Sequence, residues 1–307
     1  MTPMRVFGCV LLTIAASTSL WAAEQAPFVV GTASAAPGQT AAGAIDVPAG
    51  SDAALSIPVV VVNGARPGPV LALLAGAHGT EYASIIALEE LAATLDATTV
   101  SGTVIVVPLL NVPSFTRIVP HLNPVDGKNM NRMYPGRADG TQTERASYAV
   151  TRQVVEKSDH LIDFHGGDID ENLRPYSYWQ KTGRPAQDAA SLAMVLAFGL
   201  DHIVISTGRP TDPADSRYLE NTATTRGKPS ITVEAGRAGT VEPHDVAALV
   251  NGTLSVMRHL KMLPGAPAPV QHPVWIDRLG EHSMVPRSAT LPDLMDLPDT
   301  LERLVPL

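Results

Sequence analysis

Two residues that can bind a metal or carry a proton, His78 and Glu81, lie three positions apart in the sequence. They follow an apolar run at residues 69–74, and a helical pattern begins directly after them. In α/β proteins, side chains with chemical roles gather where strands end. Histidine and glutamate are two of the three protein ligands of a hydrolytic zinc site. Alone the pair is weak evidence, because a chain with nine histidines produces such a pair easily by chance.

Two other apolar runs end in residues of the same chemical types. Residues 161–164 lead into His165 and two glycines, and residues 231–233 lead into Glu234. If these runs and the one before His78 are parallel strands of one sheet, their carboxyl ends open on one edge. The sequence therefore predicts that these polar side chains meet at that edge.

The chemistry of the side chains suggests a role for each of them. His78, Glu81 and His165 would bind zinc and leave a fourth position for water. Glu234 would stay off the metal as the base that takes a proton from the water and returns it to the leaving group. Asp163 shares strand parity with His165, so it could orient that imidazole.

A polar and aromatic block at residues 126–136 has the composition of a binding loop. It contains Asn131 and Arg132 side by side. Arginine offers a planar fork for a carboxylate, and the neighbouring amide can add a neutral donor. The pair would select substrates with a free carboxylate, although a structural salt bridge is an alternative role for Arg132.

These motifs, in this order, resemble the succinylglutamate desuccinylase/aspartoacylase family. The motifs are His-Gly-x-Glu, Asp-Gly-x-Asn-x-Asn-Arg-x-Tyr-Pro-Gly, Asp-x-His and Val-Glu-x-Gly, and the resemblance covers roughly residues 43–263. Members are zinc deacylases with the zinc-carboxypeptidase fold. The resemblance implies zinc on His78, Glu81 and His165, catalysis by Glu234, and a substrate carboxylate on Asn131 and Arg132.

The chain departs from the family pattern in two places. Where the family has an arginine that polarises the scissile carbonyl, shortly before Asp-Gly, this chain has His121, with Arg117 nearby. Either residue is a candidate for that contact with the substrate. Many members also carry a large C-terminal β domain. Here residues 264–307 are expected to form only a short Pro-rich appendage, which would leave the cleft more open.

The elements that must position these residues follow from the alternation of patterns. Apolar runs typical of strands buried on both faces recur at residues 57–62, 70–74, 104–110, 161–164, 203–205 and 231–233. Helical patterns lie at residues 81–95, 143–157, 186–198, 215–226 and 243–263. The small residues of 31–54 suggest an edge hairpin or a loop. The pattern predicts an α/β fold with a mostly parallel or mixed sheet flanked by helices, in a catalytic domain spanning residues 24–263.

Composition limits the partners and the compartment. The net charge is -8 and there is no basic block, which argues against binding nucleic acid or an anionic membrane. Residues 1–23 have the pattern of a secretory signal peptide, with an uncleaved anchor as the alternative. We therefore expect a periplasmic or secreted protein. The only cysteine, Cys9, lies in that segment, so a metal site must use histidine and carboxylate.

The most direct interpretation is an exported zinc hydrolase that cleaves the amide bond of a small N-acyl amino acid. One alternative is an exported zinc carboxypeptidase or amidase that trims cell-wall or other short peptides. A second alternative is a metal-binding or ligand-binding protein without turnover; Glu234 argues against it. Arg174, Tyr176 and Arg237 lie near the predicted ligands in sequence and are further candidates for the pocket lining.

Overall fold

The computed structural model describes residues 26–277. The expected signal peptide with Cys9, and residues 278–307 of the expected C-terminal appendage, lie outside the described residues. The expectation that no large C-terminal β domain is present therefore stays a prediction. In the described part of the chain, no helix is both long enough and apolar enough to cross a membrane.

The structure is built on one mixed sheet of nine strands, in the order β11-β9-β8-β10-β7-β5-β6-β4-β3. A short antiparallel pair, β1 (Phe28–Val30) and β2 (Ala33–Ala35), lies apart from it. The strands of the main sheet are β3 (Gln39–Val47), β4 (Leu55–Asn63), β5 (Arg66–Ala75), β6 (Ser101–Val107), β7 (His160–His165), β8 (Tyr176–Gln180), β9 (His202–Ser206), β10 (Ser230–Glu234) and β11 (Val274–Ile276).

Both faces of the sheet are covered by helices, so its central strands are apolar on both sides. In β5, Leu71 and Leu73 belong to one core cluster, whereas Ala72 and Leu74 belong to the other. This alternation explains why the run has no polar residue. The first core contains residues of α1 (Tyr82–Thr94), α4 (Pro185–Phe198) and α6 (Pro243–His259).

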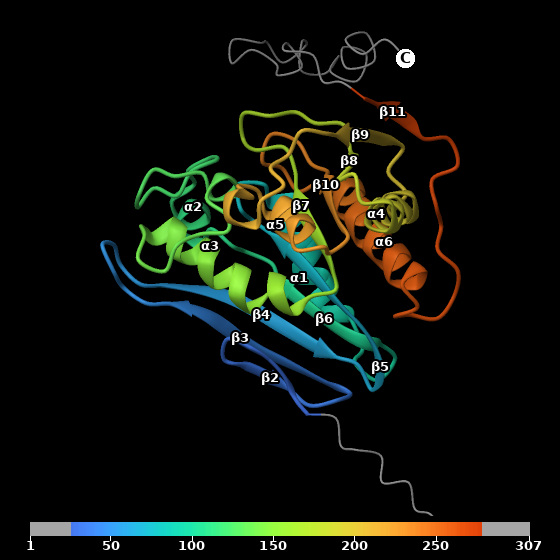
Figure 1. Ribbon diagram of the computed structural model, residues 1–307, viewed down its shortest axis with the longest axis horizontal. Helices are drawn as coiled ribbons and strands as arrows, with labels where there is room; N and C mark the ends of the chain where they lie inside the picture. The colour runs from blue at the N-terminus through green and yellow to red at the C-terminus, as the bar shows by residue number, and fades with distance from the viewer. Residues whose placement is uncertain (1–25, 278–307) are drawn as a thin grey trace, which may run out of the picture.

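The second core contains residues of α3 (Gln142–Gln153) and α5 (Leu219–Thr225). Figure 1 shows α4 and α6 side by side, with α3 and α5 away from them. A short helix, α2 (Val112–Arg117), and the 3-10 turns at Met130–Arg132, Val155–Lys157 and Pro213–Asp215 lie in the connections. The predicted α/β fold with a helix-flanked mixed sheet is confirmed.

Several predicted boundaries need correction. The helix expected at 215–226 begins at Leu219, because the backbone of Arg217 forms an antiparallel bridge with Tyr134 instead. The strand expected to run to residue 110 ends at Val107, just before a proline. The helix expected at 243–263 ends at His259.

The order of the strands determines where the chemistry lies. β5, β7 and β10 are adjacent and parallel, so the residues after their carboxyl ends meet at one edge of the sheet. β8 runs antiparallel to β10 and brings Tyr176 opposite Glu234 at the same edge. The three strand ends singled out in the sequence are therefore neighbours in space.

Candidate active site

Glu81 lies between the two histidines that the sequence pairs with it. His78 Nδ1 is 2.6 Å from Glu81 Oε1, and His165 Nδ1 is 2.9 Å from Glu81 Oε2. Glu81 is the N-terminal cap of α1, yet its carboxylate makes no capping hydrogen bond and turns toward the imidazoles instead. Glu81 and His165 are each only 3% exposed. The structure thus brings the three predicted ligands into one buried cluster.

In this cluster, attraction between opposite charges outweighs burial in setting the direction of the pKa shifts. Burial alone would raise the pKa of Glu81, but the two histidines lower it to about 2. Burial alone would lower the pKa of His78, but attraction to Glu81 outweighs burial and raises it. For His165, Asp163 and Glu81 together outweigh burial and hold the pKa well above its usual range. The three side chains are complementary in charge and fixed in position.

The outer ring nitrogens of both histidines face oxygen acceptors. His78 Nε2 lies 3.2 Å from Asn129 Oδ1, and His165 Nε2 lies 3.3 Å from Asp163 Oδ1. An imidazole that binds a metal through Nδ1 carries its proton on Nε2 and donates it to such a partner. Both carboxylate oxygens of Asp163 are buried. Unless the N–H of His165 donates to one of them, they have no hydrogen-bond partner within residues 26–277. The arrangement fits a metal on the two Nδ1 atoms.

The charge and the donor atoms also fit a divalent cation. One ligand atom each from His78, Glu81 and His165 lies within 4.8 Å of the others. Two imidazole nitrogens and one carboxylate oxygen are a typical set for catalytic zinc. Glu171 and Glu234 add further carboxylates that interact with Glu81. The site therefore has more carboxylates than histidines can balance, which a divalent cation would offset.

Glu234 lies beside the cluster and outside its ligand set. It is the last residue of β10 and pairs in register with His165 on β7 and with Tyr176 on β8. Residues paired in register project from the same face of a sheet, so these side chains share one face. Burial raises the pKa of Glu234 well above its usual range; His165 opposes this rise and Glu81 adds to it.

Asn131 and Arg132 are adjacent in sequence but have different surroundings. Asn131 is 7% exposed, with Nδ2 3.0 Å from His165 Nε2 and Oδ1 accepting the backbone N–H of Leu219 at 2.9 Å. Arg132 is exposed, donates to the carbonyl of Asn131 at 2.7 Å, and stacks over the ring of Tyr218. Among the described residues, no carboxylate forms an ion pair with Arg132. The expected pair thus separates into one buried side chain and one that faces solvent.

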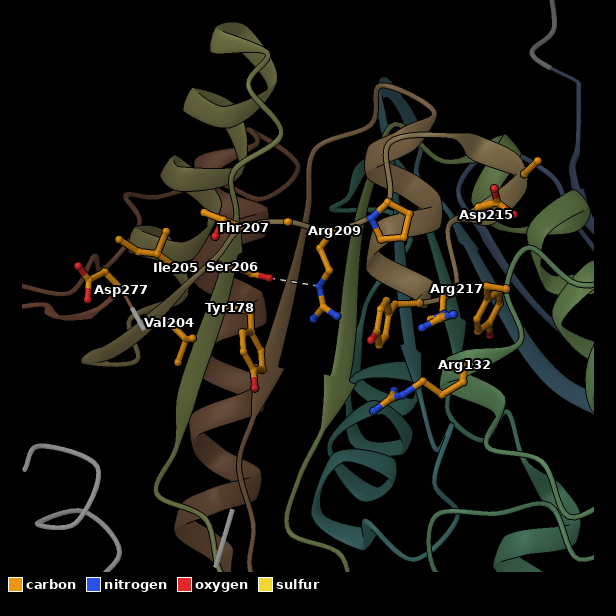
Figure 2. A pocket seen from close by; sticks show the side chains of 15 residues that line it. Arg132, Tyr178, Val204, Ile205, Ser206, Thr207, Arg209, Asp215, Arg217 and Asp277 are labelled. Carbon is orange, nitrogen blue, oxygen red and sulfur yellow. Dashed lines mark hydrogen bonds between the residues drawn. The ribbon is translucent and has the colours of Figure 1, made fainter. Parts of the chain in front are cut away.

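Arg132 lines a pocket of about 800 Å³. Figure 2 shows the side chains that line it, which come from the turn at Met130–Arg132, from β8, from the end of β9 and from the segment before α5. The lining residues are Arg132, Tyr134, Tyr178, Val204, Ile205, Ser206, Thr207, Gly208, Arg209, Pro210, Ala214, Asp215, Arg217, Tyr218 and Asp277. The volume is typical of a small-molecule site.

Residues 67–260 match the model of the succinylglutamate desuccinylase/aspartoacylase catalytic domain. The chain belongs to this family. A curated relative, the N-alpha-acetyl-L-2,4-diaminobutyric acid deacetylase of Halomonas elongata, is 33% identical over 213 residues, which are 69% of this chain. These residues span 60% of the relative's length.

Solved structures of the family share this architecture. A succinylglutamate desuccinylase from Silicibacter sp. TM1040 aligns with a TM-score of 0.72 and 26% identity, over 83% of this chain and 76% of that one. The ectoine utilization protein EutE of Ruegeria pomeroyi, solved with product bound, aligns with a TM-score of 0.69 and 30% identity, over 79% and 73% of the two chains. The fold and the family predicted from the sequence are therefore confirmed.

The two candidates for the family's carbonyl-polarising arginine lie in different places. His121 is next to the cluster, with its ring centroid 5.7 Å from that of His78. Its Nδ1 is 3.2 Å from Asp168 and its Nε2 is 2.9 Å from Asp170, so both ring nitrogens face carboxylates. Arg117 is exposed in the last turn of α2. In this geometry His121 has no ring N–H directed at a substrate carbonyl.

Two residues that the sequence pattern did not single out, Glu171 and Tyr178, join the site together with Tyr176, which it did. Glu171 accepts the backbone N–H of Asp168 at 3.2 Å and interacts with Glu81. Tyr176 and Tyr178 bring their hydroxyl oxygens to 3.4 Å, and burial together with Glu234 raises both pKa values. In the sequence, the only indication of this group is that Tyr176 follows the third predicted ligand, His165.

Two other candidates for the pocket lining have partners elsewhere. Arg174 forms an ion pair with Asp201 at 2.7 Å. Arg237 lies 3.1 Å from the ring of His244. Neither residue belongs to the lining of the pocket beside Arg132.

Proposed function

We propose that this chain is a zinc-dependent hydrolase that removes the acyl group from a small N-acyl amino acid. The observation that carries the proposal is the buried His78, Glu81 and His165 cluster, with Glu234 in register beside it. The family of the chain supports it, as does the curated relative named as a deacetylase. A metal set, an unliganded carboxylate and an adjoining pocket are the parts that hydrolysis of a small amide requires.

The roles of the residues follow from where they lie. Bound to the three ligands, zinc would polarise the scissile carbonyl and lower the pKa of the attacking water. Glu234 accepts the proton from that water and passes it to the nitrogen of the leaving amine, so the C–N bond breaks to a free amino acid. Asp163 and Asn129 hold the outer nitrogens of His165 and His78, which fixes both rings.

Substrate binding falls to Arg132 more than to Asn131. Arg132 is exposed at the pocket, and its guanidinium suits a carboxylate. Asn131 is buried beside the ring of His165 and accepts the backbone N–H of Leu219, so we assign it to positioning the start of α5. The clamp predicted from the sequence thus becomes one substrate contact and one support.

A peptidase acting on short peptides is the second candidate function. The pocket of about 800 Å³ has room for more than one amino acid, so a short peptide also fits it. Both candidates use the same cluster and differ only in what occupies the pocket.

A substrate screen on the zinc-loaded protein tests these proposals. N-acetyl amino acids and N-acetylated di- and tripeptides would be compared by the release of free amino groups, with the apoprotein as the blank. We expect release from the N-acetyl amino acids that depends on added zinc. A folded, zinc-loaded protein that hydrolyses none of these compounds would refute a hydrolytic function.

We also propose that the protein is exported, on the basis of the signal-like pattern at residues 1–23. Fractionation of cells that express the full chain checks this proposal. Recovery of a shortened chain in the periplasm or the medium is the expected outcome, and a full-length chain confined to the cytoplasm would contradict it.

A further inference from the structure

Exposed apolar side chains gather around the turn at residues 78–81, which carries two of the predicted metal ligands. Of the eight large apolar side chains that are exposed in residues 26–277, five belong to segments that surround this turn. Single exposed apolar residues are normal on a protein surface, whereas a group of them beside a site indicates a binding surface. We call this group the apolar collar; its members, which are 38–63% exposed, are Phe115, Ile118, Leu122, Ile169 and Val241.

One part of the collar packs directly against the turn that carries the ligands. A Cβ added at Gly79 would lie only 2.2 Å from the backbone nitrogen of Phe115, so the two backbones are in close contact. The ring of Phe115 meets that of Tyr82 edge to face, with centroids 5.7 Å apart. Leu122 directly follows His121, whose ring lies beside that of His78. Phe115 and Leu122 therefore belong to segments that lie next to the ligand His78.

Ile169 and Val241 approach the same turn from other segments. The hydroxyl of Thr80 donates to Asp168, the residue before Ile169. A Cβ added at Gly239 would lie 2.6 Å from the side chain of Ile169 and 3.4 Å from the carbonyl oxygen of Thr80. Val241 follows Gly239 by two residues. Three segments that are distant in sequence thus bring exposed apolar side chains to one turn.

Ile118 lies at a backbone position that disfavours isoleucine. It is the C-terminal cap of α2, with φ 54° and ψ 52° in the left-handed region. Glycine or asparagine is usual at such a cap, and a β-branched residue there is strained. The side chain of Ile118 is also 63% exposed, so packing within the protein does little to offset this strain. An apolar ligand that covers the side chain would offset the cost of exposing it.

The collar and the pocket lined by Arg132 lie on different sides of the metal cluster. In the sheet, β5 is on one side of β7, and β10 and β8 are on the other. The collar surrounds the turn that follows β5, whereas the pocket is lined from β8 and β9. Figure 1 shows α2 and β8 on opposite sides of β7. An amide bond held at the cluster would place its amino acid half toward Arg132 and its acyl half toward the collar.

The charges beside the collar disfavour an acyl group that ends in a carboxylate. Both ring nitrogens of His121 face carboxylates, those of Asp168 and Asp170, and Glu171 lies nearby. Arg117 is exposed between two collar residues and forms no ion pair within residues 26–277. Three carboxylates around one unpaired guanidinium leave this surface without a net attraction for an anion. A neutral apolar group fits it better.

We propose that the collar binds the acyl half of the substrate, and that this half is an apolar chain of medium length. The inference rests on the proposed function and specifies its acyl group. Hydrolysis adds the oxygen of water to the acyl carbon as the C–N bond breaks, so the products are a fatty acid and a free amino acid. This chain would then differ from the curated relative, which is named as a deacetylase.

Four N-acyl derivatives of one amino acid test the inference. The amino acid is the one whose N-acetyl derivative the zinc-loaded protein hydrolyses fastest, and kcat/KM is compared for the acetyl, butanoyl, succinyl and octanoyl derivatives. Octanoyl should exceed acetyl by about tenfold or more, because its extra methylenes leave water at the collar. Butanoyl should exceed succinyl, which has the same number of carbons and one more carboxylate. Acetyl or succinyl as the fastest substrate overturns the inference.

A double variant and a matched control assign the preference to the collar. Asparagine suits the left-handed backbone of Ile118, so Ile118→Asn removes the apolar side chain without added strain. Combined with Leu122→Asn, it should bring the octanoyl-to-acetyl ratio close to one. Val29→Asn, at an exposed position in β1 outside the collar, should leave the ratio unchanged. A double variant with the wild-type ratio would overturn the assignment.

Two further measurements separate this inference from its rivals and from the function on which it rests. If the collar instead joins two copies of the chain, sedimentation should show a dimer that the double variant dissociates, with the acyl preference unchanged; this result overturns the inference. If no derivative is hydrolysed, the proposed function fails, and calorimetric titration with octanoate and butanoate still tests the collar. Tighter binding of octanoate, lost in the double variant, supports the inference, and equal binding overturns it.

Discussion

The cluster of His78, Glu81 and His165 and the pocket lined by Arg132, Arg209 and Arg217 are built in different ways. Glu81 and His165 are almost fully buried, at the ends of adjacent parallel strands and the start of a helix. Arg132 and Arg217 are exposed and come from a 3-10 turn and a loop. The cluster is fixed by the sheet, whereas the pocket depends on segments that can change without disturbing the core.

This difference teaches how one family can share a reaction and differ in substrate. The proposed metal ligands and the proposed base Glu234 depend on the order of β5, β7 and β10, which the fold determines. The parts that select a substrate lie on connections between elements. A change in the pocket should therefore alter specificity alone, and a change in the cluster should alter every substrate equally.

The largest expected effect is on Glu234. Glu234→Gln removes proton transfer and should lower kcat by on the order of 10²–10⁴. Zinc content should stay the same, because Glu234 lies outside the ligand set. Steady-state rates together with metal analysis check both parts. A variant with nearly normal kcat would remove Glu234 from the mechanism.

A change at Asp163 should lower the affinity for zinc and should not change the preference among substrates. Asp163→Asn weakens the acceptor for His165 Nε2, and loss of such a partner lowers metal affinity roughly 10–100-fold. Competition with a chelator measures this loss. Asp139→Asn, at a highly exposed position, is the control. Unchanged zinc affinity in Asp163→Asn would show that the buried carboxylate does not support the ligand.

A change at Arg132 should alter the preference among substrates and should not change the affinity for zinc. Arg132→Ala is expected to lower kcat/KM for N-acyl amino acids by on the order of tenfold to a hundredfold, because a charged hydrogen bond is lost. The same variant should change little with the corresponding N-acyl amino amides, which lack the carboxylate. Equal losses on both substrate types would contradict the carboxylate contact.

The smallest effect should come from a residue outside both regions. Glu144 forms a capping box with Thr141 at the start of α3 and an ion pair with Lys128 at 3.1 Å. Glu144→Ala should lower the free energy of unfolding by about 1 kcal/mol, measured by urea denaturation, with activity per folded molecule unchanged.

The contribution of Glu144 should also depend on pH in a defined direction. The N–H of Thr141 lowers the pKa of Glu144 below its ordinary value near 4.5. A lowered pKa in the folded state stabilises the protein above the unfolded pKa, and this contribution is lost as the pH falls through the folded value. The difference between wild type and Glu144→Ala should therefore be present at pH 7 and shrink below about pH 4.5. A difference that stays constant would contradict the capping role.

The sequence predicts the central half of the fold well and its margins less well. Runs such as the one in β5 are apolar on both faces, so their pattern is unambiguous. The sequence pattern does not predict β8, because this strand is five residues long, mixes polar with aromatic side chains, and pairs antiparallel with β10. Its pairing partner is distant in the sequence, and no local pattern reveals it.

The site residues, too, divide into those that a local pattern predicts and those that depend on contacts between distant segments. His78, Glu81 and His165 were predicted because each follows a strand whose neighbours could be inferred. Asn131 and Arg132 were predicted as a pair because they are adjacent, and only the structure shows one against His165 and the other in the pocket.

The arginines of the pocket gave no sequence signal at all. Arg209 and Arg217 lie far from every motif, and the segment that holds them was expected to be partly helical. The antiparallel bridge between Arg217 and Tyr134 brings the segment of Arg217 next to that of Arg132. Long-range contacts of this kind follow from tertiary packing and leave no periodic pattern in the chain.

The zinc content of the purified chain tests the central claim most directly. After dialysis against trace zinc, elemental mass spectrometry should find about one zinc per chain, and Glu81→Ala should lose most of it while remaining folded. A folded wild-type protein that binds no zinc, or a Glu81→Ala variant that retains it, would contradict the assignment of His78, Glu81 and His165 as the metal ligands.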